Sequence, residues 1–141
     1  MQSITIKWCG PYNLERVHLS NQASENGIYI ISRLWGTSET LLYIGRTKRQ
    51  FQQRIKEHNY WLTQYRGQIK VRFGRIEGNT ISEDLLADAE SLLIILTETV
   101  ENTSNLYSYS GRSLTINNIG RRGTLAKTIS SDDLVEYYFK E

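Results

Sequence analysis

Two short runs of β-prone residues with a small loop between them constrain the fold of this chain most strongly. Residues 27–34 read GIYIISRL and residues 40–45 read TLLYIG, and both are rich in β-branched and aromatic side chains. The intervening WGTSE supplies Gly36, Thr37 and Ser38, which suit a hairpin loop. The pattern therefore predicts an antiparallel hairpin.

The register of this hairpin decides what its two tyrosines can do. If the strands pair symmetrically about Gly36, Tyr29 lies opposite Tyr43 and both rings point to the same side. A one-residue slip without a bulge would separate them. Such a pair is either a packing contact that stabilises the hairpin by roughly 0.2–1 kcal/mol or part of a reaction site.

Periodicity predicts the elements around the hairpin. ITIKW at 4–8 alternates like a short strand, and CGPYN is typical of a turn after it. Residues 50–66 have helical period, with a stripe of Phe51, Ile55, His58, Leu62 and Tyr65 ahead of Gly67. Further predictions are a strand over 69–77, a central helix capped by Ser82 that runs to about residue 100, a strand over 114–120 and a last short helix within 130–141.

Length and composition bound the class of protein. A chain of 141 residues, 39% hydrophobic and 23% charged, is expected to form a single domain over residues 1–141. The single cysteine, Cys9, excludes an internal disulfide. The start of the chain has no leader pattern, and about 18 consecutive apolar residues occur nowhere. We therefore expect a cytoplasmic or nucleoid-associated protein that is neither secreted nor membrane-bound.

Charge is divided unevenly along the chain. Residues 46–75 carry nine Lys or Arg side chains against one acid, whereas residues 76–101 carry seven acids and no Lys or Arg. This pattern indicates either a basic surface for a polyanion beside an acidic element that could hold a metal, or two solvated faces that keep the protein soluble.

Three polar residues on the predicted helices are candidates for chemistry. Arg54 and His58 are spaced i, i+4, so both are aimed at the seam between their helix and the hairpin. Glu90 shares a helical row with the apolar Leu86 and Ile94, and burying a carboxylate is costly unless it has a cationic partner or a metal. Glu90 is thus either half of a salt bridge or an oxygen ligand for Mg²⁺.

These side chains match the needs of phosphodiester hydrolysis. The reaction requires an activated water, a Lewis acid and a fixed cation for developing charge. Glu90 with a metal, Arg54, and a tyrosine or His58 acting as base would fill those roles. A tyrosine base needs assistance, because its ordinary pKa is near 10.

The combination of these motifs resembles the GIY-YIG nuclease family, in particular its restriction-endonuclease-like branch. The resemblance rests on GIY at 27–29, YIG at 43–45, the RIKEH helix and Glu90 followed twelve residues later by Asn102, and it spans residues 27–102. It implies an α/β (α+β) fold in which a small central antiparallel sheet of about three strands is flanked by helices. Residues 103–141 would form a C-terminal extension.

The resemblance also implies roles for individual residues. The implied catalytic residues are Tyr29, Tyr43, Arg54, His58, Glu90 as the single metal ligand, and Asn102, with Asn105 as a competing match for Asn102. The resemblance assigns Gly45 to the approach of the substrate, and the uneven charge adds Arg46, Lys48, Arg49 and, in the basic tail, Arg121 and Arg122 as residues expected to bind substrate. Mg²⁺ or Mn²⁺ is the expected cofactor, DNA the expected partner, and the protein would be a monomer or a homodimer.

Three functions remain open at this point. The first is a metal-dependent DNA endonuclease. The second is a catalytically silent nucleic-acid-binding module, which the basic segment 46–75 favours on its own. The third is a structural or protein-interaction domain.

Overall fold

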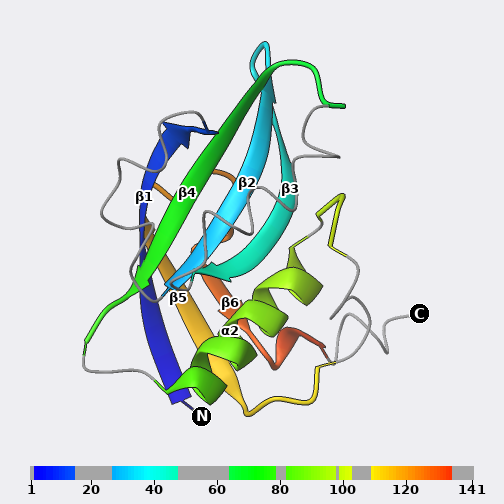
Figure 1. The fold of residues 1–141 in the computed structure, drawn as a ribbon. Helices are drawn as coiled ribbons and strands as arrows, with labels where there is room; N and C mark the ends of the chain where they lie inside the picture. The colour runs from blue at the N-terminus through cyan, green and yellow to red at the C-terminus, as the bar shows by residue number, and fades with distance from the viewer. Residues whose placement is uncertain are drawn as a thin grey trace.

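The computed structural model describes residues 2–14, 27–47, 64–78, 82–97, 99–102 and 109–134. The elements within these ranges are β1 (Gln2–Asn13), β2 (Gly27–Trp35), β3 (Ser38–Thr47), β4 (Gln68–Ile76), α2 (Glu83–Leu96), β5 (Leu114–Gly120) and β6 (Thr128–Ser130) (Figure 1). Most of the predicted helix over 50–66, and the predicted last helix beyond Leu134, lie outside the described residues.

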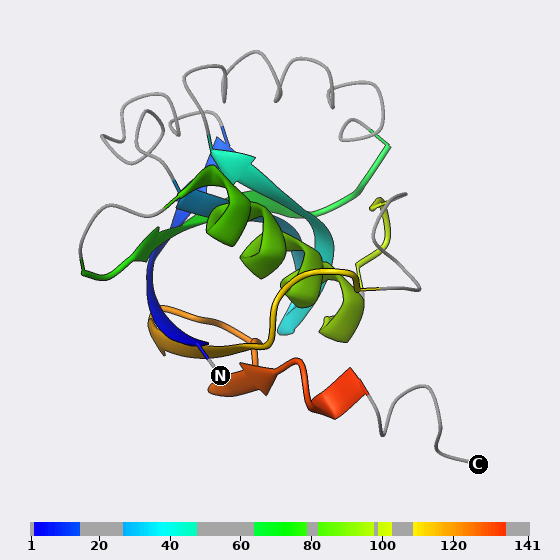
Figure 2. The same ribbon diagram turned by 90° about the horizontal axis from the view of Figure 1, so that it is seen from below.

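The strands form one six-stranded mixed sheet in the order β3-β2-β4-β1-β5-β6. All neighbouring pairs are antiparallel except β1 and β5, which are parallel. The sheet curls into a half-barrel around α2, as the view in Figure 2 shows. Strand β3 forms one edge of the sheet.

The prediction of a three-stranded sheet flanked by helices is therefore wrong: the described part of the protein is mostly β and contains one long helix. The reason lies in β1, which pairs with β4 on one side and with β5 on the other. The turn predicted at Gly10 and Pro11 is also wrong, because the strand continues through them to Asn13. Its register shifts between Cys9 and Tyr12, so the irregularity is absorbed within the strand.

Helix α2 fills the concave side of the sheet, as its apolar character predicts. The Oγ of Ser82 accepts a hydrogen bond from the backbone N–H of Leu85 at 3.1 Å, which confirms the predicted N-cap. The helix ends at Leu96, four residues before the predicted limit. Seven of its residues are buried: Leu85, Leu86, Ala89, Leu92, Leu93, Ile94 and Ile95.

The two faces of the sheet carry separate apolar clusters. The helix face packs on α2 and includes Ile28, Ile30 and Ile44. The opposite face carries Tyr29, Tyr43 and Phe73, and we call it the tyrosine face. Because side chains alternate along a strand, neighbouring residues of β2 contribute to different clusters.

Candidate functional site

The β2–β3 hairpin brings Tyr29 and Tyr43 together through a register that the sequence did not predict. Tyr29 pairs with Gly45, and Tyr43 pairs with Ile31, so the prediction that the two tyrosines lie directly opposite each other is wrong. They are diagonal neighbours on the tyrosine face instead. Their ring centroids are 5.9 Å apart, with an angle of 30° between the ring planes.

A β-bulge at Leu42 makes this arrangement possible. Trp35 pairs with Ser38 across the turn, and this register holds as far as Ser32 and Leu41; beyond that point it shifts by one residue. Without the shift Tyr43 would pair with Ile30 and face α2, since one residue of displacement turns a side chain to the other face.

Gly45 leaves space for the ring of Tyr29. A Cβ atom built at position 45 would lie 2.6 Å from both the Cζ and the Oη of Tyr29. The Tyr29 side chain is buried, with 1% of its surface exposed. Close approach to a tyrosine ring therefore explains this glycine, which the resemblance assigned to substrate binding.

Asn102 binds the open edge of β3. Its Oδ1 accepts from the backbone N–H of Ile44, and its Nδ2 donates to the carbonyl of the same residue, both at 2.9 Å. The Oγ1 of Thr99 also donates to Oδ1 at 2.7 Å. Asn102 thus satisfies backbone groups that an edge strand leaves without a neighbouring strand.

Glu90 lies on α2 beside Arg46 of β3. The Nε of Arg46 is 3.5 Å from Oε1 of Glu90, and its Nη1 is 3.6 Å from Oε2 of Glu83. Only 17% of the Glu90 side chain is exposed, against 60% for Glu83. Glu90 is thus partly buried and paired with a cation, which is one of the two arrangements that the sequence left open.

Tyr29, Asn102 and Glu90 therefore contact residues of one short segment, 43–46, at one end of β3. Tyr29 covers Gly45, Asn102 binds Ile44, and Glu90 pairs with Arg46. The tyrosines approach from one face of the sheet. Glu90 approaches from the other, because Arg46 pairs with Ile28 of the helix face.

Five of the predicted residues cannot be placed relative to this group. Arg54, His58, Lys48, Arg49 and Asn105 lie outside the described residues.

Arg121 and Arg122 begin the loop between β5 and β6. Arg121 is exposed, and its backbone N–H donates to the carbonyl of Trp8 at 2.9 Å. Arg122 donates through Nη1 to the carbonyl of Leu125 within the same loop.

Sequence reasoning missed a polar cluster beside the tyrosines. Tyr65 packs against the tyrosine-face cluster, and its hydroxyl donates a hydrogen bond to Oε1 of Glu101. The guanidinium carbon of Arg33 lies over the Tyr65 ring, 5.9 Å from its centroid. Burial, together with the hydrogen bond to the Glu101 carboxylate and its charge, raises the pKa of Tyr65 to about 12, while the charge of Arg33 opposes the shift. The only signal in the sequence was that Arg33 falls on the same strand face as Tyr29.

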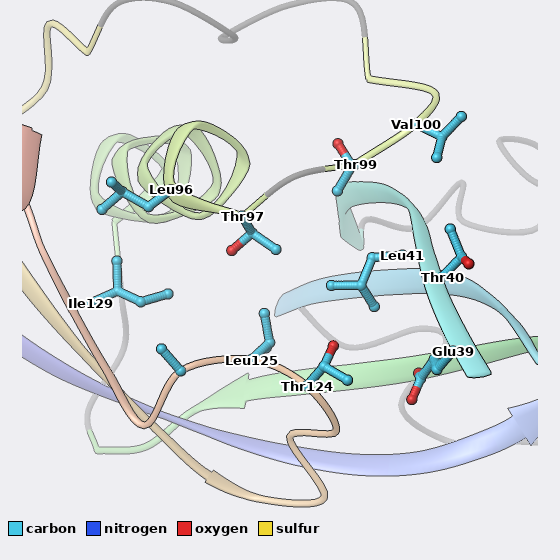
Figure 3. Close-up of a pocket in the computed structure, with 11 residues that line it drawn as sticks. Glu39, Thr40, Leu41, Leu96, Thr97, Thr99, Val100, Thr124, Leu125 and Ile129 are labelled. Atoms are coloured by element: carbon cyan, nitrogen blue, oxygen red, sulfur yellow. The ribbon is translucent and has the colours of Figure 1, made fainter. Parts of the chain in front are cut away.

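A cavity of about 650 Å³ lies between the end of α2, the start of β3 and the loop before β6 (Figure 3). Its wall is partly apolar, with Leu41, Leu96 and Leu125, and partly formed by threonine hydroxyls. Glu39 is its one charged lining residue among those described, and it forms a buried ion pair with Arg72. The cavity therefore offers no free charge for a phosphate or a metal ion.

Comparison of the chain with protein families, with curated proteins and with solved structures found no match. The resemblance to GIY-YIG nucleases accordingly rests on the motif residues themselves. Within the described ranges, no three His, Cys, Asp or Glu side chains gather as a metal site. No helix in those ranges is both long enough and apolar enough to cross a membrane.

Proposed function

We propose that the protein is a metal-dependent endonuclease that hydrolyses phosphodiester bonds in DNA. The observation that carries this proposal is the convergence of Tyr29, Gly45, Asn102 and Glu90 on residues 43–46 of β3. Each contact also has a packing or pairing role, so the proposal rests on their occurrence together at one strand end.

The side chains suit the steps of hydrolysis. Tyr43, which is only partly buried, would accept the proton of the attacking water, and the buried ring of Tyr29 would hold Tyr43 in position. Arg46, with 29% of its side chain exposed, would hold a phosphate oxygen. Arg54 and His58 would add a second cation and a second base.

Glu90 is a suitable ligand for Mg²⁺ or Mn²⁺. Carboxylate oxygen is a preferred donor for these ions, and Mg²⁺ commonly binds through one or two carboxylates while keeping several waters. The Nε of Arg46 lies 3.5 Å from this carboxylate, which is longer than a strong charge-assisted hydrogen bond of about 2.7–2.9 Å. When bound, the ion would supply a Lewis acid for the phosphoryl oxygen.

Plasmid cleavage with Mg²⁺ or Mn²⁺ tests the proposal. We expect the wild type to nick supercoiled plasmid and Glu90→Gln to lose that activity. Glu83→Gln is the matched control, because Glu83 lies on the same helix and contacts the same arginine but is 60% exposed. Wild-type cleavage no greater than that of Glu90→Gln would refute the assignment.

One observation favours the alternative of a silent DNA-binding module. Glu90 approaches from the face opposite the tyrosines and is paired with Arg46. This alternative predicts salt-dependent DNA binding that needs no metal and is unchanged by Tyr29→Phe, with no cleavage under any condition.

A further inference from the structure

The edge linker, residues 99–102, binds β3 on both sides of the Leu42 bulge. The N–H of Val100 donates to the carbonyl of Leu41 at 3.3 Å, and the N–H of Glu101 donates to the carbonyl of Leu42 at 2.8 Å. The side chain of Asn102 then forms hydrogen bonds with both the N–H and the carbonyl of Ile44. The linker thus covers the irregular part of the edge strand.

The bulge needs such support. The two-residue turn at Gly36–Thr37 favours a regular register, and that register would point Tyr43 at α2 rather than at Tyr29. Burial of Leu42, which has 0% exposure, stabilises the shifted register from the tyrosine face. The hydrogen bonds of the edge linker stabilise it from the strand edge.

The side chain of Glu101 ties the edge linker to a different element. Its Oε1 accepts a hydrogen bond from the hydroxyl of Tyr65, a residue that precedes β4 and packs on the tyrosine face. Because the pKa of Tyr65 is raised to about 12, this hydroxyl keeps its proton at neutral pH and remains a donor. At neutral pH the hydroxyl can therefore donate to the Glu101 carboxylate.

We propose that Glu101 is a positioning residue: by binding Tyr65 it holds the edge linker on β3, and so keeps the bulge that places Tyr43 beside Tyr29. Its importance for cleavage rests on the proposed function, whereas its effect on the hairpin does not. Glu101 acts through the strand and is not assigned contact with the substrate.

The test compares Glu101→Ala, Tyr65→Phe and the double variant by NMR. The readouts are hydrogen exchange at the Ile44 amide, which is bonded to Asn102, and the ring-to-ring contacts between Tyr29 and Tyr43. We expect about tenfold faster exchange of the Ile44 amide and weaker ring contacts in each single variant. The double variant should show no further change, because the two substitutions remove the same hydrogen bond. Glu101→Gln retains an acceptor and should recover most of the protection.

Glu77→Ala is the control, since Glu77 is exposed and forms only a 4.0 Å surface pair with Arg75. In a cleavage assay, the Glu101 and Tyr65 variants should lower kcat about tenfold and leave KM unchanged, as loss of one hydrogen bond would do. Unchanged exchange and ring contacts in both single variants would overturn the proposal. If the wild type cuts no DNA, the proposed function fails, and the exchange data still decide the role of Glu101.

Discussion

The ring of Tyr29 lies over Gly45 on the adjacent strand, so the tyrosine of the first tripeptide and the glycine of the second meet in one contact. The contact is buried, with 1% of Tyr29 exposed. Tyr29 and Gly45 therefore depend on each other for packing, whatever reaction they serve.

Gly45→Ala should destabilise the protein by about 1–3 kcal/mol, because the new methyl group would overlap the Tyr29 ring at 2.6 Å. Denaturant unfolding monitored by circular dichroism measures this change. Combining the substitution with Tyr29→Leu should relieve part of the overlap and give a non-additive cost. Additive losses in the double variant would mean that the clash is not with Tyr29.

Asn102→Ala should cost about 2–4 kcal/mol, since it leaves the N–H and the carbonyl of Ile44 without their partners at a buried site. Asn117→Ala is a control, because Asn117 bonds the Ser3 hydroxyl at an exposed site, and we expect a change within about 0.5 kcal/mol. Similar losses for the two variants, measured by urea unfolding, would contradict the edge-binding role of Asn102.

Glu39 and Arg72 form a buried ion pair, with side-chain exposures of 12% and 9%. Glu39→Leu alone should cost about 3–5 kcal/mol, because it leaves the guanidinium buried without its counter-charge. The double variant Glu39→Leu, Arg72→Met should be more stable than Glu39→Leu. If thermal melts show the double variant to be less stable than Glu39→Leu alone, the two side chains do not stabilise the protein through their ion pair.

Arg46→Gln should strengthen Mn²⁺ binding severalfold, because it removes the cation that lies 3.5 Å from the Glu90 carboxylate. Calorimetric titration of the protein with Mn²⁺ measures the affinity directly. Glu90→Gln should abolish the same binding. Equal Mn²⁺ affinities for the wild type and Arg46→Gln would show that Arg46 does not compete with the metal for the Glu90 carboxylate.

Tyr65 should make the stability of the protein sensitive to alkaline pH. The pKa of Tyr65 in the folded protein, about 12, exceeds the ordinary value of 10.0. The contribution of Tyr65 to the free energy of unfolding is therefore complete below pH 10 and is lost as the pH rises toward 12. Tyr65→Phe should flatten this decline in unfolding free energy. Tyr109→Phe is the comparison, because burial and Asp88 raise the pKa of Tyr109 as well. An unchanged slope in Tyr65→Phe would exclude Tyr65 as the source.

Local patterns predicted several elements correctly. Alternation located β4, β-branched and aromatic residues located β2, and the Ser82 cap followed by acidic residues located the start of α2. Alternation also located the first part of β1, but the turn predicted from Gly10 and Pro11 is wrong, because the strand continues through them. Strand pairing involves residues far apart in the chain, such as Ile4 with Ile116, and no local signal encodes such a partner.

The sequence by itself determined the residue types of the candidate site and the hairpin that carries its two tyrosines, because turn chemistry and alternation act over a few neighbouring residues. Only the tertiary structure decided that Tyr29 lies over Gly45, that Asn102 binds Ile44 and that Glu90 approaches from the opposite face. Those contacts depend on a one-residue bulge at Leu42, and a bulge is stabilised by what packs on the strand rather than by the strand's own residues.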